Sequence, residues 1–182
     1  MSVLRPFDAF GALTTWALSV KAFRRNKAPV EKKVLAAALC SGGFSYREVA
    51  SMVGGISYIA ARDAYLSMVT SLPEETRRYR REVAIDGSEV PMGGRRYCVW
   101  LARDADSGEI LAFHGSPTGS AEDGARFLAA VGSVCLNKPA VRLGQGAGTS
   151  TGLLNLDLYF QSSPSRSSFI DRIGKIFRGN GP

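Results

Sequence analysis

The stretch YCVWLARDADSGEILAFH, residues 97–114, decides the predicted fold. Residues 97–103 alternate between two sets of side chains, which is the period of a β-strand. Residues 104–108 are rich in Asp, Ser and Gly and predict a turn. Residues 110–114 are largely apolar and predict the return strand. The stretch therefore predicts an antiparallel β-hairpin.

Further strands and helices are predicted on both sides of this hairpin. Val83-Ala84-Ile85 is a short apolar run that predicts a strand ending at Asp86-Gly87-Ser88. Ser120 predicts the start of a helix, and residues 139–143 predict another short strand. Residues 169–177 have apolar side chains at helical spacing. A hairpin followed by a strand–helix–strand unit predicts a mixed sheet with flanking helices, an α/β fold.

The first part of the chain predicts helices only. The first two are expected over residues 7–26 and 29–41, and two shorter ones follow. Ser45-Tyr46-Arg47-Glu48 has the pattern of a capping box, which opens a short helix, Tyr46–Val53. Gly54-Gly55 breaks that helix, and Ser57 can cap a second helix, Tyr58–Val69. Two capped helices joined by a tight glycine turn outline a helix-turn-helix. A plain helical hairpin has the same outline, so both interpretations stay open.

The distribution of charge favours a polyanionic partner for this helical part. The formal net charge of the chain is +7, and residues 1–85 carry 13 basic against 7 acidic side chains. In helix-turn-helix geometry the second helix reads bases in the major groove of double-stranded DNA, and Arg62 can contact a guanine. The side chains predicted to contact DNA are Arg47, Ser57, Tyr58, Arg62, Lys32, Lys33, Arg77, Arg78, Arg80 and Arg81.

Several classes of protein are disfavoured by the composition. Cys40, Cys98 and Cys135 are scattered, without a Cys-x-x-Cys pair, so they form neither a zinc site nor a disulfide framework. A single histidine, His114, leaves little basis for Ser-His-Asp chemistry. No apolar stretch is long enough for a membrane span, and residues 9–20 predict an amphipathic helix rather than a signal peptide. We therefore expect a cytoplasmic, DNA-associated protein that does not contact a membrane.

An ordered series of segments resembles the compact DDE insertion-sequence transposases of the IS-six type. The resemblance covers about residues 30–143. Upstream, Phe44-Ser45-Tyr46-Arg47-Glu48-Val49-Ala50 resembles the helix-turn-helix of that family. The segments that resemble its catalytic domain are residues 83–86, 94–104, 107–112, 120–128 and 137–141.

The resemblance implies an RNase H-like fold after an all-α helix-turn-helix domain. We expect the first domain over residues 1–76 and the second over residues 77–182. The family implies three carboxylates that hold two Mg²⁺ or Mn²⁺ ions for DNA strand transfer. Carried over by position, Asp86 is the first catalytic and metal-binding acid and Asp171 the third. The family also implies a homo-oligomer.

The second acid of the family is missing at its expected position, where this chain has Gly144. The residue after Asp86 is Gly87, where the family usually has an acid, and Asp171 stands where the family has glutamate. We therefore expect a degenerate transposase with little or no activity and without a metal cofactor. One alternative is an active enzyme with a rearranged metal site, in which Asp104 or Asp106 replaces the missing ligand.

A second alternative comes from the glycines that follow residue 143. The sequence from Val141 to Gly148 resembles a glycine-rich turn after a strand, as in nucleotide-binding enzymes. The glycines are out of register with G-x-G-x-x-G, and few residues follow for a complete dinucleotide half. This alternative assigns the loop Gly144–Gly148 to phosphate binding.

Overall fold

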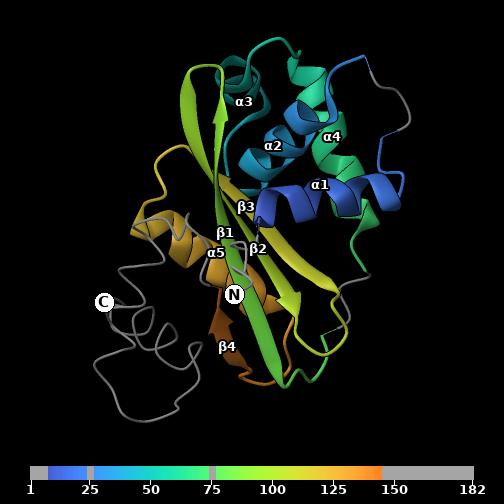
Figure 1. Ribbon diagram of the computed structural model, residues 1–182, viewed down its shortest axis with the longest axis vertical. Helices are drawn as coiled ribbons and strands as arrows, with labels where there is room; N and C mark the ends of the chain where they lie inside the picture. The colour runs from blue at the N-terminus through green and yellow to red at the C-terminus, as the bar shows by residue number, and fades with distance from the viewer. Residues whose placement is uncertain (1–7, 24–26, 74–76, 145–182) are drawn as a thin grey trace, which may run out of the picture.

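The computed structural model describes residues 8–23, 27–73 and 77–144. Within these ranges the chain folds into five helices and one four-stranded mixed sheet, which confirms the α/β class (Figure 1). The helices are α1 (Ala9–Ser19), α2 (Val30–Ser41), α3 (Tyr46–Val53), α4 (Tyr58–Ser71) and α5 (Ala121–Ser133). The strands are β1 (Glu82–Met92), β2 (Arg95–Asp104), β3 (Ile110–Ser116) and β4 (Ala140–Leu143).

The sheet has the strand order β3-β2-β1-β4. The predicted hairpin is present, with β2 and β3 antiparallel, and β1 also pairs with β2 in antiparallel fashion. After β3 the chain crosses over through α5, and β4 then joins the opposite edge parallel to β1. The sheet is therefore mixed, as the order of segments predicts.

The strand β1 is longer than predicted. It does not end at Asp86 but continues to Met92, because β2 pairs with it along its whole length. Gly93 and Gly94, with φ of 60° and 75°, form the two-residue turn between the two strands. β4 pairs only with the first four residues of β1, up to Ile85. Asp86 therefore lies within a strand, at the point where the pairing with β4 ends.

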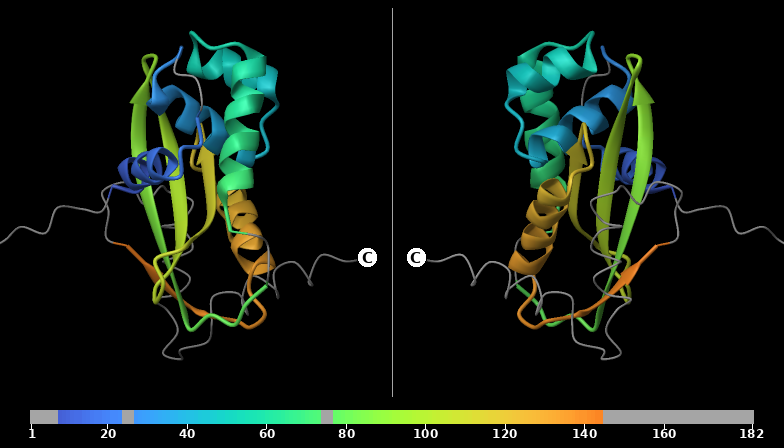
Figure 2. Two further views of the ribbon diagram at one scale, coloured as in Figure 1. Left: turned by 90° about the vertical axis from the view of Figure 1, so that its right-hand side faces the viewer. Right: turned by 90° about the vertical axis from the view of Figure 1, so that its left-hand side faces the viewer.

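Helices cover both faces of the sheet, so each face has its own core (Figure 2). On the face of α1 and α2, Leu101 and Phe113 belong to the first core, and the ring of Trp16 lies 6.5 Å from that of Phe113. On the face of α5, the ring of Trp100 lies 6.0 Å from that of Phe127. Both sets of alternating side chains predicted for residues 97–102 are therefore used in packing.

Two glycines let α2 approach the sheet closely. A Cβ built on Gly42 would overlap the carbonyl oxygen of Gly115, and one built on Gly115 would lie 2.8 Å from the backbone nitrogen of Leu39. As a result, apolar residues of α2, α3 and α4 share one core with residues of β1, β2 and β3. The division into residues 1–76 and 77–182 stays a prediction, and the helices pack directly on the sheet across that boundary.

The first helix is shorter than predicted. It ends at Ser19 and not near residue 26, and Lys21 follows with a positive φ of 53°. Leu18 is 54% exposed, whereas Leu13 and Ala17 are buried. Among the described residues, no helix combines the length and the apolarity that crossing a membrane requires. The helix predicted over residues 169–177 lies outside the described residues.

Candidate nucleic-acid interface and carboxylate site

The helices α3 and α4 begin where the sequence predicts, and side chains cap both. Ser45 Oγ accepts a hydrogen bond from the Glu48 backbone N–H at 3.3 Å, and the Ser45 N–H donates to Glu48 Oε2 at 2.9 Å. These hydrogen bonds lower the pKa of Glu48. Ser57 Oγ accepts from the Ala60 N–H at 3.1 Å. The predicted capping box and second cap are therefore confirmed.

The turn between α3 and α4 depends on two glycines and one lysine. Gly54 and Gly55 have φ of 67° and 70°, a backbone conformation that glycine adopts without strain. Lys32 of α2 donates from Nζ to the Gly54 carbonyl oxygen at 2.8 Å. Lys32, predicted to contact DNA phosphate, thus fixes the turn. We call the unit formed by α2, α3 and α4, residues 30–71, the helical head.

One surface of the helical head carries three of the predicted DNA-contacting side chains. Arg47 and Arg62 are exposed, and Tyr58 is 47% exposed. The Arg47 guanidinium lies 5.3 Å from the centroid of the Tyr58 ring, which is within cation–π range. Arg62 lies one helical turn after Tyr58, and its Nη2 is 2.9 Å from Asp63 Oδ1. The structure thus places Arg47, Tyr58 and Arg62 at the start of α3 and α4.

The same two helices bury their other sides in the core. Val49 and Val53 of α3 are buried, and Ala61, Ala64 and Met68 of α4 recur every three or four residues on its buried side. Packing against α2 therefore fixes which side chains of α4 face solvent. The Arg47–Tyr58 pair belongs to the solvent-facing side because of that packing.

Lys33, also predicted to contact phosphate, is 9% exposed. Its ammonium lies 5.2 Å from the centroid of the Phe23 ring, and burial lowers its pKa. A side chain so enclosed does not reach a phosphate on the surface. Lys33 therefore does not belong to the surface formed by Arg47, Tyr58 and Arg62.

The arginine run before β1 is divided between buried and exposed positions. Arg80 is 7% exposed, and its Nη1 lies 2.9 Å from Asp104 Oδ2 and 3.0 Å from Glu109 Oε2. Burial acts to raise the pKa of Asp104, but hydrogen bonds from Ser107, Arg80 and Asp106 outweigh it and lower that pKa. Arg80 therefore serves as a structural cation and is not available to a phosphate.

The other three arginines of this run are exposed, and all three contact neighbouring segments. Arg77 donates from Nε to the carbonyl oxygen of Ser133 at 2.9 Å. Arg81 pairs with Asp106 and, at 3.9 Å, with Glu82. The backbone of Arg78 forms a parallel bridge with Cys135, and its side chain is exposed. These residues tie the segment before β1 to the end of α5 and to the β2–β3 turn.

The sheet brings the first two predicted acid positions together. The Gly144 N–H donates to the Ile85 carbonyl oxygen at 2.8 Å, and a Cβ built on Gly144 would overlap Asp86 Oδ1. Asp86 is 7% exposed, and its Oδ2 accepts a hydrogen bond from Arg103 Nη2 at 3.0 Å. Asp86, Arg103 and Gly144 therefore form one cluster. Asp171, the predicted third acid, lies outside the described residues.

This cluster does not fit a divalent cation. Mg²⁺ and Mn²⁺ need several anionic or neutral oxygen ligands, and here one carboxylate faces a guanidinium. No group of three acidic, histidine or cysteine side chains suited to a metal occurs among the residues that the structure describes. The Asp86 carboxylate also occupies the space into which a side chain at position 144 would project.

The acids considered as replacement ligands have other roles. Asp104 pairs with Arg80, and its Oδ1 accepts hydrogen bonds from the N–H groups of Asp106 and Ser107 at 2.9 Å. Asp106 pairs with Arg81. In the sheet register Asp104 lies opposite Val83, whereas Asp86 lies opposite Leu101. Asp104 and Asp106 therefore stabilise the β2–β3 turn and its contact with the segment before β1.

Gly144 is also the only residue of the proposed phosphate-binding loop that the structure describes. Its N–H is used in the hydrogen bond to Ile85, and the Asp86 carboxylate lies beside it. An anion next to a carboxylate is repelled, so position 144 is unsuited to a phosphate. Residues 145–148 lie outside the described residues.

Sequence reasoning missed Arg103, although the sequence contains a signal for it. A two-residue turn at Gly93-Gly94 fixes the register, in which Asp86 lies opposite Leu101 and Ala84 opposite Arg103. Arg103 is then a diagonal neighbour of Asp86 on the same face of the sheet. Because the strand was predicted to end at Ser88, this register could not be deduced.

The chain is similar to an archaeal protein. No family model matches the chain. The chain is 31% identical over 144 residues to the uncharacterized protein MJ0017 of Methanocaldococcus jannaschii, and the match spans 78% of this chain and 67% of the archaeal protein.

Proposed function

This chain belongs to the same family as the archaeal protein MJ0017, and we propose that it binds duplex DNA as a transposase-type protein with a degenerate catalytic site. In this proposal the helical head is a helix-turn-helix, and the sheet with α5 is the beginning of an RNase H-like domain. The archaeal relative adds no activity to the proposal, because it is itself uncharacterized.

The observation that carries the DNA-binding proposal is the exposed group of Arg47, Tyr58 and Arg62. In a helix-turn-helix, side chains near the N-terminus of the second helix reach base edges, and the first helix crosses the backbone. Tyr58 and Arg62 occupy the first and second turns of α4, and Arg47 lies in the first turn of α3. Arg62 suits a guanine and Arg47 a phosphate. The pair between Arg62 and Asp63 is exposed and exchanges at little cost.

The adjacency of Asp86 and Gly144 supports the transposase part of the proposal. These positions are 58 residues apart in sequence, and they meet at the end of β4. A single carboxylate that is held by Arg103, without a second acid at position 144, offers too few oxygen ligands for a divalent cation. We therefore propose that strand transfer is lost or strongly impaired, that no metal cofactor is held, and that DNA binding persists in a homo-oligomer.

Duplex binding at several salt concentrations tests this function. We expect the affinity of the full chain for a short duplex to fall steeply with salt, and Arg47→Ala to reduce that salt slope by about one. Arg62→Ala is expected to weaken binding about tenfold. Arg96→Ala is the matched control, because this exposed arginine lies on the β1–β2 hairpin.

The result that overturns the proposal is equally direct. If the chain does not bind duplex DNA at low salt, the helical head is a plain helical hairpin. If Arg96→Ala lowers the affinity as much as Arg62→Ala, the interface lies elsewhere. Fluorescence anisotropy of a labelled duplex measures both outcomes.

A further inference from the structure

The β1–β2 hairpin extends past the other two strands of the sheet and reaches the helical head. β4 pairs with residues 82–85 of β1, and β3 pairs with residues 98–103 of β2. In the part of the chain that the structure describes, residues 90–97 therefore form a ribbon of two strands only, which we call the hairpin end. A two-stranded ribbon alone is marginally stable in water, so another element has to support it.

The helical head provides this support, and Figure 1 shows the hairpin end beside α3. Val90 and Tyr97 are buried in the same core as Val53 of α3. The Tyr97 hydroxyl donates a hydrogen bond to the Met52 carbonyl oxygen at 2.7 Å. A Cβ built on Gly93, in the turn, would lie 3.9 Å from the carbonyl oxygen of Val53. The hairpin end is therefore fixed against the last turn of α3.

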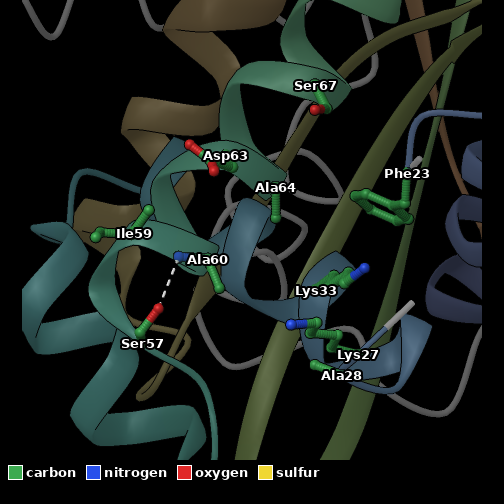
Figure 3. A pocket seen from close by; sticks show the side chains of 10 residues that line it. All are labelled: Phe23, Lys27, Ala28, Lys33, Ser57, Ile59, Ala60, Asp63, Ala64 and Ser67. Atoms are coloured by element: carbon green, nitrogen blue, oxygen red, sulfur yellow. Dashed lines mark hydrogen bonds between the residues drawn. The ribbon is translucent and has the colours of Figure 1, made fainter. Parts of the chain in front are cut away.

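This contact also places the hairpin end near the start of α4. The last turn of α3 leads through Gly54-Gly55 to Ser57, whose hydroxyl caps α4 (Figure 3). Tyr58 and Arg62, which we propose to contact DNA, lie in the first two turns of α4. The hairpin end and the DNA-contacting side chains of α4 therefore flank the same turn.

The two arginines of the hairpin end lie on opposite faces of the ribbon. Arg95 pairs with Met92 in the register, and Arg96 pairs with Pro91. Cross-strand partners share a face, and Met92 packs against the core of the head, so Arg95 is on the face of the head. Arg96 is on the other face, and its Nη1 lies 2.8 Å from Glu89 Oε2. Both arginines are exposed, and Arg95 has no ion-pair partner among the described residues.

We propose that the hairpin end is a second duplex-contacting element, in which Arg95 binds a backbone phosphate beside the base pairs that α4 reaches. The inference rests on the proposed function, because it adds a contact to the same duplex. A guanidinium held at a fixed place suits a phosphate. A Cβ built on Gly94, in the turn, would meet no atom of the described chain within 4 Å. The outer side of the turn is therefore open to an approaching duplex.

Fluorescence anisotropy of a labelled duplex, repeated over a series of salt concentrations, tests the inference. Each phosphate contact contributes about 0.9 to the dependence of log affinity on log salt. We expect Arg95→Ala to reduce this slope by about that amount and Arg95→Lys to retain it, because a lysine also neutralises a phosphate. Arg96→Ala removes the same charge from the adjacent residue on the other face, so it is the matched control and is expected to leave the slope unchanged.

The outcomes separate this inference from duplex binding itself. If Arg62→Ala weakens binding and Arg95→Ala has the slope of the unmodified chain, the second contact is overturned and the proposed function stands. Equal reductions of the slope by Arg95→Ala and Arg96→Ala also overturn it, because general attraction between the duplex and positive charge then accounts for both. A full chain that does not bind duplex DNA at low salt overturns this inference and the proposed function together.

Discussion

Two arginines of the helical head differ in accessibility from two arginines in and beside the sheet. On the head, Arg47 and Arg62 are exposed, and Arg47 covers the ring of Tyr58. Just before β1, Arg80 is buried against two acids, and in β2 Arg103 holds the buried carboxylate of Asp86. The comparison teaches that a net positive charge does not identify a binding surface. Which basic side chains are accessible has to be known as well, and on α3 and α4 Arg47 and Arg62 are accessible.

The largest expected effect concerns Arg80. Arg80→Ala leaves Asp104 and Glu109 without their shared cation, and breaking a buried ion pair costs about 3–5 kcal/mol of folding free energy. Arg81→Ala, in the same run, removes only an exposed side chain and is expected to leave stability nearly unchanged. Urea unfolding measures both. Equal losses would contradict the division of this run into buried and exposed cations.

The next largest effect is a loss of folding stability at low pH, caused by His114. His114 is 7% exposed in β3, its ring lies 5.4 Å from that of Phe127, and burial lowers its pKa to about 4. The folded state therefore holds this ring neutral, whereas the unfolded chain takes up a proton below its ordinary pKa of 6.5. Stability from this residue is complete above that value and falls as the pH drops from about 6.5 to about 4, by up to about 3 kcal/mol.

Unfolding at pH 7.0 and pH 5.0 measures this dependence on acid. His114→Gln is expected to flatten it, since glutamine does not titrate in this range. If the variant loses as much stability between the two pH values as the unmodified chain, His114 is not the residue responsible.

A smaller effect concerns the Asp86 cluster. Gly144→Asp places a second carboxylate beside Asp86, so we expect this variant to be destabilised without a cation and to be stabilised by Mg²⁺ or Mn²⁺. At a metal concentration 100 times the dissociation constant the gain is about 2.7 kcal/mol. Gly144→Asn is the matched control, because it adds the same bulk without the charge. Thermal unfolding with and without metal tests this, and the same response in both variants would contradict it.

The smallest effect concerns the caps of the helical head. Ser45→Ala removes the acceptor for the Glu48 N–H and is expected to cost about 1 kcal/mol. Ser51→Ala, at an exposed interior position of α3, is the control and should cost nothing measurable. Since α3 carries Arg47, a weaker cap is also expected to lower duplex affinity slightly. A Ser45→Ala chain as stable as the control would show that the cap contributes nothing.

Much of this architecture follows from local patterns. The capping box at Ser45, the cap at Ser57 and the alternation along residues 97–103 each fix one element through contacts close in sequence. The predicted end of β1 was wrong. Asp86-Gly87-Ser88 has the composition of a turn, but pairing with β2 keeps this segment extended. Tertiary pairing outweighs local turn propensity here.

The candidate site was harder to predict than the fold. Composition places Lys32, Lys33 and Arg80 among the cations of a DNA-binding surface, but it does not indicate which of them are buried. Lys32 donates a hydrogen bond to the Gly54 carbonyl oxygen. Arg80 pairs with two acids from a distant segment, and Lys33 is buried. These contacts depend on the packing of α2 and on the β2–β3 turn, which only the folded chain specifies. The proximity of Asp86 and Gly144 was predictable, because the resemblance assigns both positions to one carboxylate site.

One gel measures both halves of the comparison. Supercoiled plasmid is incubated with the full chain at low salt, with Mg²⁺ or Mn²⁺, and its migration is followed. We expect retarded plasmid, from binding by the helical head, and no conversion to the nicked form. Unretarded plasmid, or metal-dependent nicking that disappears in Asp86→Ala, would contradict a DNA-binding chain with an incomplete carboxylate site.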